Sequence, residues 1–73
     1  MTEFDEYNYC LAQIDMLKEK LRNMGFEYDE HHGWYNYYNR PLSKKQKDDF
    51  EDAKLKITKY TEYSGMLRKK LGI

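Results

Sequence analysis

The chain has 73 residues and carries thirteen basic and thirteen acidic side chains, so its formal net charge is zero. This length allows one domain at most, residues 1–73, and the balanced charge indicates neither a nucleic-acid footprint nor an acidic mimic of DNA. The single cysteine excludes an internal disulfide, and no apolar run approaches membrane-spanning length. Together with an acidic N-terminus unlike a secretory signal, these features predict a cytoplasmic protein without a membrane segment.

The first predicted element is a helix that Thr2 opens and Gly25 ends. Asp5 and Glu6 lie in its opening turn, where negative charge is favoured by the helix dipole. Apolar side chains recur at heptad spacing and form a seam along one face. The members of this seam are Tyr7, Cys10, Ile14, Leu17, Leu21 and Met24. Because Cys10 belongs to the seam, we interpret it as a small buried hydrophobe rather than a reactive thiol.

A short aromatic β-hairpin is predicted between residues 26 and 38, which contain six of the twelve aromatic side chains. Residues 26–30 and 34–38 have strand-like composition, and the turn falls at His31-His32-Gly33. If Phe26 and Tyr28 face the helices, some aromatic side chains of the second strand must face outward. We therefore predict a partner-binding surface on this hairpin, made of Trp34, Tyr35, Tyr37, Tyr38 and Arg40.

The second predicted helix runs from Ser43 to Leu71 and has the longest helical pattern in the chain. Ser43 and Gln46 form a capping box at its start, and Gly72 closes its end. The four acids within residues 48–52 near the start and the basic residues 68–70 near the end suit the helix dipole. Its apolar seam consists of Phe50, Ala53, Ile57, Tyr60, Ser64, Leu67 and Leu71.

Charge order along the chain predicts that the two helices pack antiparallel. In that direction the acidic start of the first helix meets Arg68, Lys69 and Lys70, and its basic end meets the acids of residues 48–52. Parallel packing would place acid against acid. The predicted fold is therefore α+β and mainly α: two long antiparallel helices joined by the hairpin, in the order α-β-β-α.

No catalytic, cofactor-binding or metal-binding motif is visible, so we expect no enzyme activity, no cofactor and no metal site. His31 and His32 stand beside Asp29 and Glu30, but adjacent residues in a turn point in different directions.

Several apolar side chains lie off both seams, and the hairpin is too small to cover them all. We consider four of them a candidate oligomer interface, through which a homodimer would resemble a four-helix bundle. These residues are Tyr9, Met16, Leu55 and Met66.

The leading hypothesis for function is a small non-enzymatic module that docks on a larger protein of unknown identity and modulates or inhibits it. Eight tyrosines and no valine indicate an AT-rich gene, which suits an inhibitor from a phage or mobile element. Two alternatives stay open. The first is a nucleic-acid-binding protein that uses the lysine-rich face of the second helix, and the second is a structural homodimer. The lysines of that face are Lys44, Lys45, Lys47, Lys54, Lys56 and Lys59.

Overall fold

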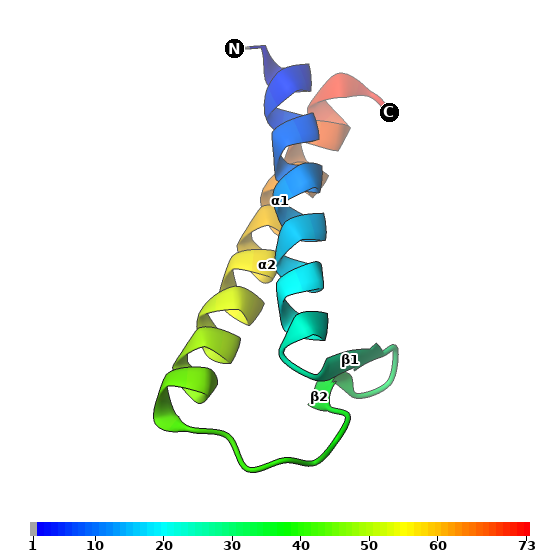
Figure 1. The fold of residues 1–73 in the computed structure, drawn as a ribbon. Helices are drawn as coiled ribbons and strands as arrows, with labels where there is room; N and C mark the ends of the chain where they lie inside the picture. Colours follow the sequence, from blue (N-terminus) through cyan, green and yellow to red (C-terminus); the bar gives the residue numbers. More distant parts are fainter. Residues whose placement is uncertain (1) are drawn as a thin grey trace.

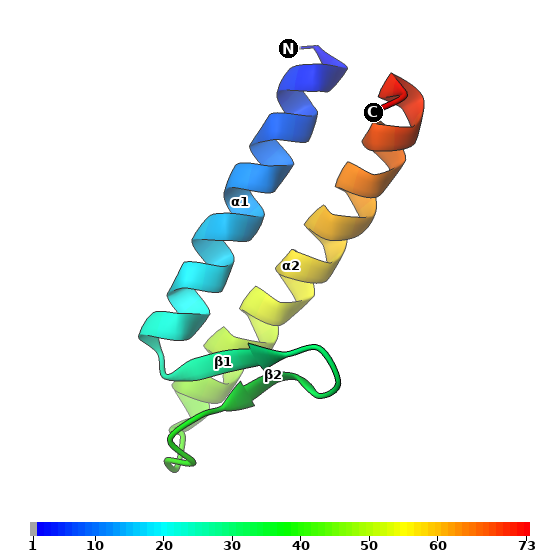
Figure 2. The ribbon, with the colours of Figure 1, turned by 90° about the vertical axis from the view of Figure 1, so that its right-hand side faces the viewer.

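The computed structural model describes residues 2–73, which form two helices with a two-stranded hairpin between them (Figure 1). The elements are α1 (Glu3–Asn23), β1 (Phe26–Asp29), β2 (Gly33–Asn36) and α2 (Lys44–Leu71). The helices run antiparallel and side by side, so the start of α1 and the end of α2 lie together and the hairpin lies at the opposite end (Figure 2). The molecule is elongated, with extents of 43 × 25 × 15 Å. The predicted α-β-β-α fold is confirmed.

Side chains cap both helices at their starts. The backbone N–H of Asp5 donates to Thr2 Oγ1 at 3.1 Å, and Gln46 N–H donates to Ser43 Oγ at 3.2 Å. In each case the later side chain accepts from the cap residue's own N–H, which completes a capping box. Gly72 ends α2 at a φ of +71°, and its N–H reaches Arg68 O at 3.0 Å. The boundaries of both helices therefore follow from local chemistry.

Both predicted seams face the interior. On α1, Cys10, Ile14 and Leu21 are buried, and on α2 the buried residues are Ala53, Ser64 and Leu67. The other seam residues are half-buried, namely Tyr7, Leu17, Met24, Phe50, Ile57, Tyr60 and Leu71.

The main core lies at the hairpin end, where Leu21, Phe26 and Ala53 are buried together. The rings of Phe26 and Phe50 stack at a centroid distance of 4.2 Å, which joins β1 to α2. Trp34 and Leu42 pack around the same cluster. The hairpin is therefore a lid on the helix pair, and its own apolar side chains complete the core.

The expected charge pairing is present at only one end. Lys70 Nζ lies 3.6 Å from Glu3 Oε1, as the antiparallel arrangement predicts. At the other end, no ion pair within residues 2–73 links the basic end of α1 to the acids of residues 48–52. Those acids also lie beyond the first turn of α2, which holds Lys44, Lys45 and Lys47 instead. The side-chain charges of this helix therefore favour its dipole at the C-terminal end and not at the N-terminal end.

The hairpin is shorter than the sequence suggests. β1 and β2 pair antiparallel from Asp29↔Gly33 at the turn to Phe26↔Asn36 at the base, where Gly25 adjoins the ladder with a φ of +94°. Residues 37 and 38 form a turn rather than the end of a strand. Strand alternation therefore does not determine where Tyr37 and Tyr38 point, contrary to our expectation.

Within residues 2–73, neither helix has the continuous apolar length that crossing a membrane requires.

Candidate functional site

Three tyrosines and an arginine form a continuous exposed row at the base of the hairpin, which we call the outer aromatic surface (Tyr35, Tyr37, Tyr38 and Arg40). Tyr35 is 41% exposed, and Tyr37 and Tyr38 are each 59% exposed. The ring centroids of Tyr35 and Tyr37 lie 6.4 Å apart, and those of Tyr37 and Tyr38 lie 5.1 Å apart in an edge-to-face arrangement. The Arg40 guanidinium carbon lies 4.8 Å from the centre of the Tyr38 ring. The four side chains thus support one another without being buried.

Backbone hydrogen bonds hold the turn that presents this surface. Tyr37 N–H donates to Gly25 O at 3.1 Å, and Asn39 N–H donates to Asn36 O at 3.0 Å. Asn39 adopts a φ of +50°, a left-handed conformation that asparagine tolerates better than most residues. The Asn36 amide nitrogen then donates to Arg40 O at 2.6 Å. These bonds fix the chain direction on both sides of Tyr38, so the surface is ordered before any partner arrives.

Trp34 was predicted to belong to the same surface, but it occupies the opposite face of the hairpin. It is half-buried, packs against the core, and pairs with Tyr28 across the strands at a ring-centroid distance of 5.5 Å. The guanidinium carbon of Arg22 lies 5.9 Å from the Trp34 ring centre. This tryptophan therefore joins the hairpin to α1 and to the core.

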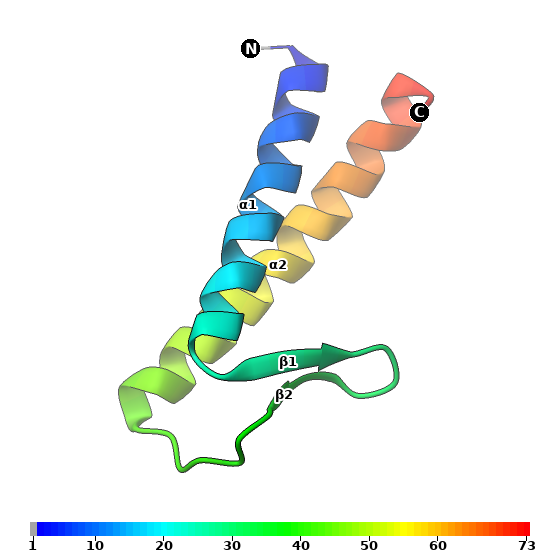
Figure 3. The ribbon, with the colours of Figure 1, turned by 45° about the vertical axis from the view of Figure 1, so that its right-hand side comes forward.

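Tyr28 is a possible contact residue that the sequence did not identify. It shares the inner face with Phe26, as expected from alternation, yet it is 57% exposed because it lies near the hairpin turn, beyond the core cluster. A groove of about 300 Å³ runs between this part of the hairpin and α2, and it includes Trp34 and Ile57. Figure 3 shows the hairpin crossing the end of the helix pair with its turn projecting to one side. Tyr28 is exposed because the hairpin extends beyond the helices, and no local sequence signal predicts that extension.

The four candidate oligomer residues do not form one patch. Tyr9 lies beside α2, with its ring edge-on to Tyr60 at 6.3 Å between centroids. Leu55 and Met66 share the face of α2 opposite its seam, and the exposed charges of Lys59 and Glu62 lie between them in the sequence on that same face.

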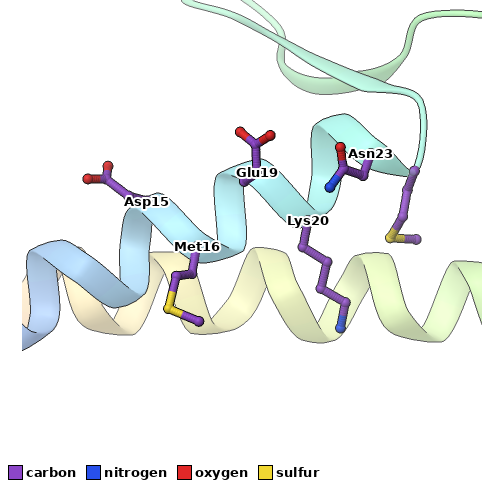
Figure 4. Close-up of a pocket in the computed structure, with 6 residues that line it drawn as sticks. Asp15, Met16, Glu19, Lys20 and Asn23 are labelled. Atoms are coloured by element: carbon purple, nitrogen blue, oxygen red, sulfur yellow. The ribbon is translucent and has the colours of Figure 1, made fainter.

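Met16 is exposed on α1 and borders a shallow depression with charged neighbours. Figure 4 shows Met16 and Lys20 extending from one side of the helix, and Asp15 and Glu19 from the other. Scattered apolar side chains of this kind are common on protein surfaces.

The lysine-rich face of α2 is partly neutralised by its own helix. Lys56 Nζ pairs with Asp52 Oδ2 at 3.0 Å, and the Lys54 ammonium lies 5.5 Å from the centre of the Phe50 ring. Lys44, Lys45, Lys47 and Lys59 are exposed.

The titratable groups with shifted pKa values lie where the two helices meet, away from the outer aromatic surface. Burial, with a contribution from the Glu6 charge, raises the pKa of the Cys10 thiol, which favours the unreactive protonated form. The Tyr63 hydroxyl donates to Glu6 Oε2 at 2.8 Å, and this bond raises the pKa of Tyr63. Burial also raises the pKa of Tyr60, with Tyr9 adding to the shift. These three pKa shifts therefore result from the packing of α1 against α2.

Asp29 and His32 approach within 3.6 Å at the hairpin turn, where Asp29 also accepts a hydrogen bond from His31 N–H at 2.7 Å. Within the described residues, no three His, Cys, Asp or Glu side chains gather closely enough to hold a metal ion. The Asp29 contacts serve to close the turn.

No protein-family model, no curated protein and no solved structure matches this chain.

Proposed function

We propose that this protein is a small non-enzymatic binding module that docks on a larger protein through the outer aromatic surface and modulates or inhibits that protein. An inhibitor encoded by a phage or a mobile element is the specific form of this proposal that suits the chain's size and composition.

One observation carries the proposal: Tyr35, Tyr37, Tyr38 and Arg40 are in mutual contact, exposed and held by a hydrogen-bonded turn. Tyrosine and arginine are enriched among the residues that dominate binding energy at protein interfaces. Tyrosine has few rotatable bonds, so its large contact area is immobilised at low entropic cost. A rigid turn lowers that cost further because its backbone is already ordered.

Core formation does not account for these rings. Phe26 and Trp34 close the open end of the helix pair, whereas Tyr35 and Tyr37 do not belong to the core cluster. Because these two rings are largely exposed to water, they contribute little to the stability of the fold. A partner that covers them would gain the burial of about three aromatic side chains.

The test is a set of single alanine substitutions at Tyr35, Tyr37 and Arg40, with affinity and folding measured separately. The chain is immobilised through residue 73, remote from the hairpin, and a retained protein is identified from a lysate of the native host. At least one substitution should weaken binding of that protein about tenfold or more, while the helical circular dichroism and the melting temperature stay unchanged.

Phe4→Ala serves as the matched control, because Phe4 is an exposed aromatic residue at the opposite end of the molecule. It should alter neither affinity nor folding. If every loss of affinity is accompanied by an equal loss of stability, the hairpin is only a structural lid and the proposal fails.

Nucleic-acid binding is the second candidate function, favoured by the exposure of Lys44, Lys45 and Lys47 directly after the outer aromatic surface in the chain. Such binding would weaken steeply as salt increases, because phosphate contacts release counterions. A binding constant that stays nearly constant between low and physiological salt would argue against it.

A homodimer is the third candidate, supported by the exposure of Met16, Leu55 and Met66. Sedimentation at micromolar concentration should then give twice the chain mass, and Leu55→Glu should restore the monomer. A monomer at high concentration would leave these residues without a role in self-association.

A further inference from the structure

A cavity of about 280 Å³ lies where the end of α1, the base of the hairpin and the start of α2 meet. Figure 3 shows the loop that follows β2 passing beyond the end of α1 to reach α2. Four separate parts of the chain line the cavity, so it exists only in the folded protein. Its polar and aromatic lining residues include Arg22, Asn36, Tyr38, Arg40 and Gln46.

The lining residues include two arginines and no aspartate or glutamate. Each guanidinium is placed over an aromatic ring: Arg22 lies 5.9 Å from the Trp34 centroid, and Arg40 lies 4.8 Å from the Tyr38 centroid. The shorter contact, on Tyr38, restricts the rotamers of Arg40, so binding of a ligand there costs less side-chain entropy. A cavity with this lining favours an anion.

The carboxylate of Glu19 could compete with a ligand for Arg22, but its contact with Arg22 is weak. Arg22 Nη1 lies 4.0 Å from Glu19 Oε2, and both side chains are largely exposed. An exposed pair of this kind contributes little, because water and salt screen it. Glu19 is also absent from the cavity lining, so an incoming anion can replace it.

Two amide side chains increase the excess of hydrogen-bond donors. Gln46 Oε1 accepts from Ser43 N–H at 2.9 Å, which leaves the Gln46 amide nitrogen as the free end of the group. The Asn36 amide nitrogen donates to Arg40 O, and this bond fixes the backbone that carries the second guanidinium. The capping box of α2 and the turn after β2 thus orient the lining of the cavity.

We propose that this cavity binds a carboxylate of an acidic side chain in the protein that the outer aromatic surface contacts. The inference rests on the proposed function, because Tyr38 and Arg40 belong to both the surface and the cavity. Arginine pairs with carboxylates through two parallel hydrogen bonds, and such charge-assisted bonds are among the stronger polar contacts. The partner segment therefore carries an aspartate or glutamate beside the residues that cover Tyr35 and Tyr37.

Dimensions and charge favour a protein carboxylate over a nucleic acid. A space of about 280 Å³ is suited to a single side chain. Extended nucleic acid instead requires cations along several successive phosphates. Acids Asp48, Asp49, Glu51 and Asp52 follow Gln46 within six residues and would repel such a backbone.

The experiment uses nuclear magnetic resonance of the isotope-labelled full chain. The probe is a capped tetrapeptide, Trp-Glu-Glu-Leu, and its counterpart has glutamine in place of both glutamates. The glutamate peptide should produce saturable shifts in the side-chain N–H signals of Arg22, Arg40 and Gln46. The glutamine peptide should bind about tenfold more weakly.

Arg40→Gln and Arg22→Gln should each weaken binding of the glutamate peptide by about fivefold or more. Lys59→Gln removes the same charge from an exposed site on α2 outside the cavity, and it should change the affinity by less than about twofold. Circular dichroism of all three variants checks that the fold is intact.

Equal binding of the two peptides, unchanged affinity in both arginine variants, or shifts that do not saturate would overturn the carboxylate site. Tighter binding of a ten-residue oligothymidine, with a steep salt dependence, would also overturn it and would assign the cavity to phosphate. None of these results bears on the aromatic contacts, because Tyr35 and Tyr37 lie outside the cavity lining. Their alanine variants therefore test the proposed function separately.

Discussion

The two ends of the helix pair are built differently. At the hairpin end, α1, α2 and β1 each contribute a fully or nearly fully buried side chain, namely Leu21, Ala53 and Phe26. At the other end, where α1 starts and α2 ends, the described residues 2–73 provide the two helices and no third element over them (Figures 1 and 2). Cys10, Ser64 and Leu67 are the buried residues there.

Within residues 2–73, the side-chain hydrogen bond and the ion pair that join the two helices both lie at the terminal end. Tyr63 bonds to Glu6, Lys70 pairs with Glu3, and Ser64 Oγ donates to Thr61 O at 2.9 Å. The exposed contacts of Tyr63 and Lys70 contribute less than the burial of large apolar side chains. Two helices alone cannot enclose a core, and the hairpin supplies the missing cover. Stability should therefore be concentrated at the end that also carries the candidate binding site.

Truncating one buried leucine at each end measures the difference in packing most directly. Leu21→Ala should cost about 4–5 kcal/mol, near the upper limit for such changes, because three packed elements surround the cavity it leaves. Leu67→Ala should cost about 2–3 kcal/mol, since its surroundings are open to water and can relax. Urea unfolding of the two variants measures the difference. An equal or larger cost at Leu67 would show that the terminal end is as well packed as the hairpin end.

Trp34 and Tyr35 are neighbours in β2 whose side chains lie on opposite faces of the hairpin. Trp34→Ala should destabilise the fold by about 1–3 kcal/mol, because its ring covers the core. Tyr35→Ala should cost less than about 0.5 kcal/mol, as expected of a surface substitution. Thermal unfolding distinguishes the two. Similar costs for both variants would mean that the hairpin does not have distinct structural and exposed faces.

The terminal end can also be strengthened without touching the hairpin. Gly65 lies inside α2 at an ordinary helical φ, and a Cβ added there would meet no atom within 4 Å. Gly65→Ala should stabilise the protein by about 0.5–1 kcal/mol, because glycine loses more backbone entropy on folding than alanine does. The urea midpoint should rise. A decrease would mean that the smaller residue is needed at this position.

The smallest expected effect concerns pH. The bond from Tyr63 to Glu6 raises the pKa of Tyr63 above its ordinary value of about 10. The folded state therefore holds this proton more tightly, and the resulting stability is complete below pH of about 10 and lost as pH rises through the folded-state pKa. Tyr63→Phe should reduce the loss of stability between neutral and strongly alkaline pH.

The raised pKa of the Cys10 thiol acts in the same direction, so the informative quantity is the difference between wild type and Tyr63→Phe at the two pH values. An identical alkaline loss in both proteins would show that the Tyr63–Glu6 bond is absent in solution.

Much of the fold could be predicted because its signals are local or periodic. Thr2, Ser43 and Gly72 define helix ends through their own hydrogen bonds, and both apolar seams follow from the helical repeat. Antiparallel packing followed from charge order, although only the Glu3–Lys70 pair forms as expected. That partial success has a physical reason, since long exposed side chains gain little from any single pairing.

The arrangement of the candidate site was less accessible. Strand alternation predicts that Trp34 and Tyr35 point to opposite faces of the hairpin. Composition alone could not show which of the two faces the core. The positions of Tyr37 and Tyr38 depend on the positive φ of Gly25 and Asn39 and on the bond from Asn36 to Arg40. The contribution of Arg22 depends on where α1 ends relative to the hairpin. None of these features has a periodic signature in the sequence.

The meeting of the start of α1 and the end of α2 opposite the hairpin has a practical consequence. The molecule is 43 Å long, so a tether at Ile73 holds the outer aromatic surface at the far end of a helical stalk. Two copies joined by a flexible linker at that end would present two hairpins to a dimeric or surface-bound target at once. The second contact would then form at a high effective concentration, and a weak monovalent module would become a tight bivalent one without any change to its binding residues.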